Sequence, residues 1–350
     1  MAKKGPAGIV CFTVLSVFVF LQAWDSTAQS SRPGWGATPY SGGVTFRVWA
    51  PHATNVTVAG DFNGWSTTSR PLALESATSG VWSVDVSGAT AGQNYKYLIN
   101  SPSNYKTDPR SRLINTADNN NSVVVNPTNF NWQGDSYSMT NSRDLVIYEA
   151  HVGTFMGPSG TFSSFTNRLD YLRDLGVSAI ELMPVNEFPS ATSWGYNPAY
   201  PFSIETSYGA PDALRQLVLR SHQNGIAMLL DVVHNHWDGG SSLWQFDGWS
   251  PDGVHGGQYF YNTEPYANTP WGPRPDYSTS QVCAAINDTF RMWLGEYRFD
   301  GFRWDAPSHI IYTTNGVFIS DGLDMISNAL AVMSAEYPGT LNIAEDIKEL

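Results

Sequence analysis

The sequence contains little cysteine, little charge and few basic residues. Only two cysteines occur in 350 residues, and charged side chains make up 14% of the chain. The 31 acidic residues outnumber the 19 lysines and arginines, which gives a formal net charge of -12. Because nucleic-acid binding requires a basic surface, this balance argues against a nucleic-acid partner.

Long hydrophobic runs are also scarce. The main one, Ile9 to Leu21, follows a lysine-containing start and is too short for a typical membrane span. Ser26-Thr27-Ala28 then supplies the small residues of a cleavage site, so we expect residues 1–28 to be a signal peptide. The mature protein would be exported to the periplasm or the extracellular space and would not be held by a membrane. An uncleaved anchor is the alternative. Cleavage would leave Cys283 as the single cysteine and exclude an intramolecular disulfide.

Aromatic residues are abundant, at 13% of the chain. Most of them are expected in the core, but many aromatics combined with low charge also suit uncharged ligands with flat faces, such as sugars. The length is sufficient for two domains.

Residues 32–126 show the pattern of a small β domain. Asn63-Gly64 lies at the centre of a predicted turn, and short alternating segments surround it. This spacing predicts a β-sandwich. Its expected strands are Val44–Trp49, Val56–Gly60, Val81–Val86 and Asn94–Asn100. The polar, turn-rich residues 127–142 would form a linker.

From residue 143 to residue 350, predicted strands and helices alternate, which indicates a parallel sheet. The loops that follow the strands are longer than those that precede them, as in a (β/α)₈ TIM barrel with its active site at the carboxyl ends of the strands. The expected strands are Leu145–Ala150, Val177–Met183, Ile226–Val233, Phe299–Trp304 and Leu341–Ala344. The expected helices include one through Phe165–Leu172, then Asp212–Gln223, Gln281–Tyr297 and Asp321–Tyr337.

Polar residues follow three of these strands. Asp305 comes directly after a buried strand, and Arg303, two residues earlier, would point to the same side and lower the pKa of Asp305. An ionised carboxylate can act as a nucleophile at a sugar carbon, although a structural Arg–Asp pair is the alternative. Asp305 and Glu345, at neighbouring strand ends, would flank a glycosidic bond, one as the nucleophile and the other as an acid with a raised pKa.

Three motifs, at residues 231–236, 299–306 and 342–346, occur in the order found in glycoside hydrolase family 13, the α-amylase family, and the chain resembles that family over most of residues 144–350. The resemblance implies that Asp305 is the nucleophile and Glu345 the general acid/base. It also implies substrate-binding or site-supporting roles for Arg303, His236, Tyr196, Asp231 and His309. No cofactor is implied as required, but Asn235 occupies a position that binds calcium in many α-amylases, so calcium use stays open.

The first domain resembles carbohydrate-binding module family 48. The resemblance rests on Gly60-Asp61-Phe62-Asn63-Gly64-Trp65, Tyr95-Lys96-Tyr97 and Asp108-Pro109. It implies that Trp65 stacks on a sugar and that Lys96 contacts it, with Tyr105 as the nearest substitute for a second stacking residue. The alternative is a structural module without a sugar site.

Two features depart from the usual α-amylase pattern. The sequence stops just after the fifth predicted strand, so we expect only about the first five strands of the barrel, as in a C-terminally truncated protein. Ser308 stands where many α-amylases have lysine. The segments around Trp194, Trp271 and Glu345 look closer to branching enzymes and trehalose-releasing relatives.

We therefore expect an exported, retaining enzyme that acts on α-1,4-glucan (starch, glycogen or maltodextrin) and is most like a 1,4-α-glucan branching enzyme. The alternative within the family is an α-amylase-type or trehalose-releasing hydrolase. A non-catalytic glucan-binding protein is the alternative from another class, because a five-stranded barrel with open edges is expected to be inactive and prone to aggregation when produced alone.

Overall fold

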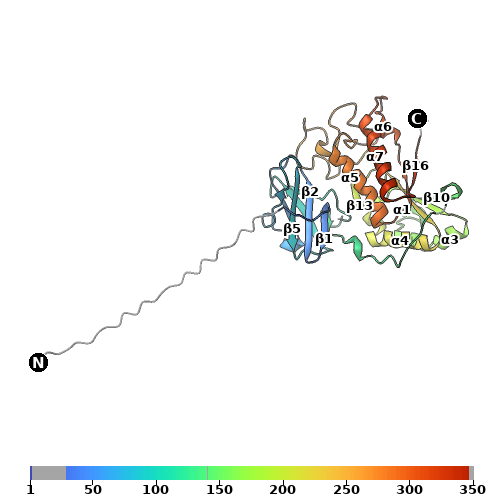
Figure 1. Ribbon diagram of the computed structural model, residues 1–350, viewed down its shortest axis with the longest axis horizontal. Helices are drawn as coiled ribbons and strands as arrows, with labels where there is room; N and C mark the ends of the chain where they lie inside the picture. The colour runs from blue at the N-terminus through green and yellow to red at the C-terminus, as the bar shows by residue number, and fades with distance from the viewer. Residues whose placement is uncertain (2–28, 140, 347–350) are drawn as a thin grey trace.

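The computed structural model describes residues 1, 29–139 and 141–346. The predicted signal peptide lies almost wholly outside these residues. None of the helices described is both long and apolar enough to cross a bilayer. Figure 1 shows a β domain, in blue and teal, beside an α/β portion coloured from green to red.

The β domain consists of two antiparallel sheets, as predicted. Phe46 of the first sheet and Tyr95 of the second meet in its core, with ring centroids 5.0 Å apart. The first sheet has the order β1 (Gly36–Tyr40), β2 (Gly43–Trp49), β5 (Val81–Ser87) and β4 (Ala73–Leu74). The second has the order β3 (Val56–Gly60), β6 (Asn94–Ile99), β9 (Asn121–Val123) and β8 (Ile114–Asn115), with β7 (Tyr105–Lys106) also paired to β6.

The α/β portion contains a five-stranded sheet in which every neighbouring pair is parallel. This arrangement confirms the prediction of the first five strands of a TIM barrel. The strands, in spatial order, are β10 (Ile147–Ala150), β11 (Ala179–Leu182), β14 (Ala227–Val232), β15 (Gly301–Trp304) and β16 (Leu341–Ala344). A small antiparallel pair, β12 (Asn186–Glu187) and β13 (Tyr200–Ile204), lies in the connection between β11 and the next helix.

The helices connect these strands and differ from the predictions at two places. The helix expected through Phe165–Leu172 is divided, and the helix expected at 281–297 ends in a π-helical turn. The helices are α1 (Val152–Phe155), α2 (Phe162–Thr166), α3 (Leu169–Asp174), α4 (Pro211–Gln223), α5 (Ser280–Arg291), the π-helical turn Met292–Glu296, α6 (Ser308–Ile311) and α7 (Ser320–Glu336). Short 3₁₀ turns occur at Asp61–Asn63, Pro127–Asn129, Ser142–Asp144, Thr206–Tyr208 and Gly257–Tyr259.

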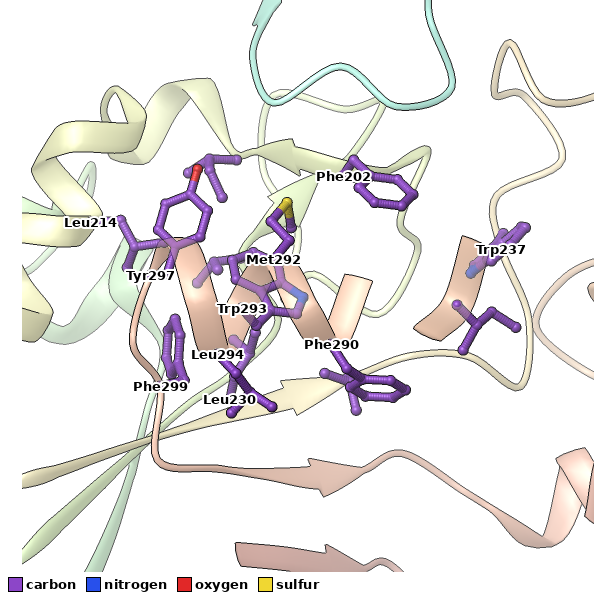
Figure 2. Close-up of a cluster of buried hydrophobic side chains, with 14 of the residues drawn as sticks. Phe202, Leu214, Leu230, Trp237, Phe290, Met292, Trp293, Leu294, Tyr297 and Phe299 are labelled. Carbon is purple, nitrogen blue, oxygen red and sulfur yellow. The ribbon is translucent and has the colours of Figure 1, made fainter. Parts of the chain in front are cut away.

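The π-helical turn carries part of the core between the helices and the sheet. Figure 2 shows Trp293, Tyr297 and Phe299 gathered in this cluster with Leu230 of β14. The Phe299 ring packs edge-on against Trp293 at 5.7 Å, and its backbone N–H donates to the Trp293 carbonyl. Phe299 therefore packs against the turn, and strand β15 begins at Gly301 rather than at the predicted Phe299.

The predicted linker is packed under the α/β sheet. Asp135 accepts a hydrogen bond from Nδ1 of His222 at 2.9 Å, and the Tyr137 ring stacks on His222 at 4.6 Å. Tyr137 and Met139 contact the buried side chains of Ala179 and Ala227. This segment thus covers the amino ends of the strands, opposite the ends that carry the polar residues.

The β domain rests on the loop that follows β14. The rings of His52 and Trp249 stack at 4.1 Å, and His52 also contacts Asp247 at 3.0 Å. Two ion pairs connect the β domain to α5 and the turn after it: Arg110 with Asp288 at 2.7 Å, and Arg112 with Glu296 at 2.6 Å.

Candidate active site

Arg303, near the end of β15, lies at the centre of the polar cluster. Its Nη1 donates to Asp231 Oδ2 at 2.6 Å and to Asp305 Oδ1 at 3.3 Å. Its Nη2 pairs with Glu345 Oε1 at 2.7 Å. The parallel register places Arg303 beside Asp231 on β14, while Glu345 directly follows β16. One guanidinium therefore joins the carboxylates from three adjacent strand ends.

Asp305 is held by Asn235 as well as by Arg303. The Asn235 amide donates to Asp305 Oδ2 at 2.6 Å and to the Asp305 backbone carbonyl at 2.9 Å. Burial raises the pKa of Asp305 by more than Asn235 and Arg303 lower it, so the net pKa lies above its ordinary value. Arg303 lowers the pKa of Asp305, as predicted, but the net shift has the opposite direction because the side chain is only 14% exposed and Glu345 adds a second negative charge.

Glu345 is oriented by two donors, and 33% of its side chain is exposed. Oε1 pairs with Arg303, and Oε2 accepts a hydrogen bond from the backbone N–H of Ala306 at 2.9 Å. Ala306 has a φ of +38°, a conformation uncommon outside glycine. The chain turns sharply just after Asp305, and this turn directs the next N–H at Glu345. The Arg303 guanidinium and the backbone at residues 305–306 thus position both Asp305 and Glu345.

Asp231 is the fully buried carboxylate of the cluster. It accepts a hydrogen bond from the Tyr196 hydroxyl at 2.7 Å, and its side chain has no exposed area. Burial raises the pKa of Asp231 to about 7, and the charge of Asp305 adds to this, while Arg303 and Tyr196 oppose it. Burial, followed by the charge of Asp231, also raises the pKa of Tyr196. Tyr196 therefore stays a neutral donor with its ring fixed beside the carboxylates.

Two histidines and a tryptophan lie next to the carboxylates. His236 Nε2 donates to the Tyr196 backbone carbonyl at 2.8 Å, and burial lowers the pKa of His236 to about 4. The Trp271 ring lies 5.8 Å from that of His236 and 4.8 Å from that of His309. Trp271 is 54% exposed, whereas His309 is buried.

Trp271 is not among the site residues predicted from the sequence. Its signal there is a Pro-Trp-Gly sequence in a long loop, within a segment that resembles branching enzymes and trehalose-releasing relatives. The structure gives it an exposed indole face beside two buried histidines, which a flat sugar ring can contact.

The surroundings of Asn235 do not fit a calcium site. Its amide nitrogen donates to Asp305, and its amide oxygen contacts His236 Nδ1, so both ends of the amide are engaged. Among residues 29–139 and 141–346, the acidic, histidine and cysteine side chains form no group of three or more that could hold a metal ion.

In the β domain, Trp65 and Lys96 both lie near one end of the second sheet. The Trp65 indole N–H donates to Asp61 at 2.9 Å, and Lys96 Nζ donates to the Asn119 carbonyl at 2.6 Å. Burial lowers the pKa of Lys96, while Asp118 partly opposes this. Tyr105, on β7, is 40% exposed.

Comparison with known proteins supports both halves of this architecture. Residues 35–111 match the model of carbohydrate-binding module 48, the isoamylase N-terminal domain, and residues 117–273 match the α-amylase catalytic domain. Residues 117–273 therefore match the α-amylase family. The module and the partial barrel are therefore the two parts expected from the sequence motifs.

The similar proteins include more than one activity. The chain is 33% identical over 300 residues to malto-oligosyltrehalose trehalohydrolase of Saccharolobus solfataricus, covering 84% of this chain and 49% of that protein. It is 31% identical over 336 residues to 1,4-alpha-glucan branching enzyme GlgB of Corynebacterium jeikeium, covering 89% of this chain and 46% of that protein.

Two solved structures have the same fold. One, described as an alpha amylase candidate from Salmonella typhimurium, superposes with a TM-score of 0.75 at 28% identity, covering 89% of this chain and 49% of that one. The other, a pullulanase from Bacillus acidopullulyticus, has a TM-score of 0.74 at 25% identity, covering 89% and 41%. The chain spans about half the length of the curated relatives it matches.

Proposed function

We propose that the protein is a retaining enzyme that cleaves α-1,4-glucosidic bonds and is most like a 1,4-α-glucan branching enzyme. The observation that carries the proposal is the contact of Arg303 with Asp231, Asp305 and Glu345. A retaining mechanism requires one carboxyl group on each side of the bond that is cleaved. The Arg303 guanidinium holds Asp305 and Glu345 at neighbouring strand ends, where they can take these two positions.

In the proposed reaction, Asp305 attacks the anomeric carbon while Glu345 protonates the departing glycosidic oxygen. A covalent glycosyl-enzyme forms, and Glu345 then removes a proton from the incoming acceptor. Asn235 and Arg303 orient the attacking carboxylate. Glu345 is the more exposed of the two acids, which suits a group that exchanges protons with successive acceptors.

The acceptor decides between branching and hydrolysis. A glucan 6-hydroxyl would give a branch, whereas water would give hydrolysis. Similarity to branching enzymes at 31–32% identity supports transfer. Similarity to the trehalohydrolase at 33% identity supports a trehalose-releasing hydrolase as the second candidate.

The test uses a C-terminally completed form of the protein (the full-length form), in which the barrel can close. The enzyme is incubated with amylose, and reducing ends are measured before and after treatment with a debranching enzyme. Branching predicts few new reducing ends before debranching and many after it. An equal number before and after would mean hydrolysis, and no change in amylose would contradict both activities. A second incubation with maltooligosyltrehalose tests for trehalose release.

Three further expectations accompany the proposal. The substrate is α-1,4-glucan (starch, glycogen or maltodextrin), the protein is exported after loss of residues 1–28, and no cofactor is required. N-terminal sequencing of secreted material that begins at Gln29 would support export. Retention of full activity after chelator treatment would support a reaction without calcium.

A further inference from the structure

A cavity of about 440 Å³ lies where the β domain meets the α/β portion. Its wall combines Thr116 and Asn120 of the β domain, the segment Glu187–Ala191, Tyr200 with its neighbours in the same connection, and Gly240 from the loop after β14. The volume is within the range of about 300–1,000 Å³ that is common for small-molecule sites. None of the candidate catalytic residues forms part of the wall.

Glu187 gives the cavity a buried acceptor. The residue is 3% exposed, and both of its hydrogen bonds fall on Oε2, from the Thr206 N–H at 2.8 Å and the Thr206 hydroxyl at 2.6 Å. No ion pair involving Glu187 occurs in the described part of the chain, and no donor there bonds to Oε1. Burial, followed by the charge of Glu205, raises the pKa of Glu187 to about 7.

Glu205 differs from Glu187 because both of its oxygens are used by the backbone. Oε1 accepts from the Ser207 N–H at 3.0 Å and Oε2 from the Phe188 N–H at 3.2 Å. Glu205 therefore holds the connection in place, whereas Glu187 retains an oxygen for a ligand.

The wall suits a neutral polyhydroxyl compound. It contains no lysine or arginine, so an anion would have no charge partner among the lining residues. It contains the rings of Phe188 and Tyr200, hydroxyl groups, and the free oxygen of Glu187. A sugar presents an apolar ring face and hydroxyl donors, which match an aromatic side chain and a carboxylate oxygen.

One segment of the chain contributes residues both to the cavity wall and to the active site. Tyr196, which bonds to Asp231, lies in the connection between Glu187 and Tyr200. Within the same region, the Asp238 N–H donates to the Pro198 carbonyl at 2.9 Å, which joins this connection to the loop after β14. The segment that carries Tyr196 therefore connects the cavity wall to the active site along the chain.

We propose that this cavity is a glucan subsite, in which Glu187 Oε1 accepts a hydrogen bond from a hydroxyl of a glucose residue distant from the bond that is cleaved. The inference rests on the proposed function, because it assumes an α-glucan substrate. It assigns the junction between module and barrel a direct part in binding the chain.

The test measures binding without turnover. Full-length protein carrying Asp305→Asn to prevent cleavage and Trp65→Ala to remove the predicted module site is titrated with maltoheptaose by calorimetry. Adding Glu187→Gln is expected to weaken binding about tenfold, which corresponds to about 1.4 kcal/mol. Glu264→Gln is the matched control, because Glu264 bonds to Asn268 outside the cavity and should leave binding unchanged.

A second variant guards against a structural effect of changing Glu187. Ala191→Trp places a large side chain at the exposed edge of the cavity without altering either buried acid. It should also weaken maltoheptaose binding while the melting temperature stays within the error of the parent. Unchanged affinity in both variants would overturn the subsite.

One control distinguishes a sugar subsite from a cation site. A second control separates failure of the subsite from failure of the proposed enzyme function. Calcium that raises the melting temperature of the parent but not of the Glu187→Gln variant would overturn the sugar assignment in favour of a cation. The proposed function is tested separately by turnover: if Asp305→Asn alone abolishes cleavage and the cavity variants do not change affinity, the subsite fails and the enzyme assignment stands.

Discussion

Asn235 donates its side-chain amide to the carboxylate of Asp305 at 2.6 Å, between the ends of two neighbouring strands. The same nitrogen also contacts the backbone carbonyl of Asp305. The position and the ionisation of the proposed nucleophile thus depend on a neutral amide as well as on Arg303. A donor of this kind stabilises the charged form of a carboxyl group.

Replacing Asn235 with alanine should shift the pH dependence of the enzyme. Burial already raises the pKa of Asp305, and the Asn235 hydrogen bond lowers it, so removing the bond should raise the pKa further. Asp305 must be ionised to attack, so the acidic limb of kcat/KM should move to higher pH. A pH profile on maltodextrin measures this.

Asn268→Ala is the control for the Asn235 variant, because Asn268 is exposed and its side chain bonds to Glu264 rather than to a candidate site residue. Its profile should match the parent. An acidic limb that stays in place in Asn235→Ala would contradict the role given to the amide.

Glu345→Gln should affect substrates according to their leaving groups. The amide cannot donate a proton as a carboxylic acid does, so cleavage of natural glucan should fall by about 10²–10⁴-fold. An activated substrate such as a glucosyl fluoride needs no proton at the leaving group, so formation of the glycosyl-enzyme should be largely retained. Equal losses with both substrates would remove Glu345 from the acid role.

The packed linker predicts a stability that depends on pH. Burial alone would lower the pKa of His222, but Asp300 and Asp135 raise it above its ordinary value of 6.5. The protonated ring is therefore favoured in the folded state. Its contribution should be fully present below about pH 6.5 and should disappear as the pH rises through the raised folded value.

His222→Gln should lower the free energy of unfolding by about 2 kcal/mol under acidic conditions, from the loss of charge-assisted hydrogen bonds. The difference from the parent should shrink as the pH increases. Urea unfolding of the two proteins at several pH values tests this, and a difference that grows with pH would have the wrong sign.

The module should bind α-glucan through Trp65. Affinity electrophoresis in gels containing glycogen compares the parent with Trp65→Ala, and loss of the tryptophan face should reduce retardation. Tyr105→Ala tests Tyr105, which is 40% exposed. Retardation that persists in Trp65→Ala would exclude Trp65 as the main platform, and no retardation of the parent would leave the module with a structural role.

The clustering of the acids was predictable because it follows from strand order. Parallel strands bring their carboxyl ends to one edge, so residues just after consecutive strands meet there. The sequence therefore indicated that Asp231, Asp305 and Glu345 would lie together, and the register of β14 with β15 places Asp231 beside Arg303.

Other contacts depend on geometry that no local pattern contains. The left-handed turn at Ala306 aims an N–H at Glu345, and the long loop after β14 brings Trp271 onto His309. Burial of Asp305 reversed the expected direction of its pKa shift. The polar composition of residues 127–142 indicated a linker. In the structure this segment packs under the sheet, where its residue Tyr137 stacks on His222.

The most direct test of the proposed mechanism is to trap the glycosyl-enzyme. Full-length protein is treated with a fluorinated glucosyl fluoride that reacts quickly in the first step and slowly in the second, and peptides are then analysed by mass spectrometry. We expect a covalent sugar on the peptide that contains Asp305, with the bond at that residue, and none in Asp305→Asn. A sugar attached to another carboxylate, or turnover with inversion of the anomeric configuration and no adduct, would contradict the assignment of Asp305 as the nucleophile.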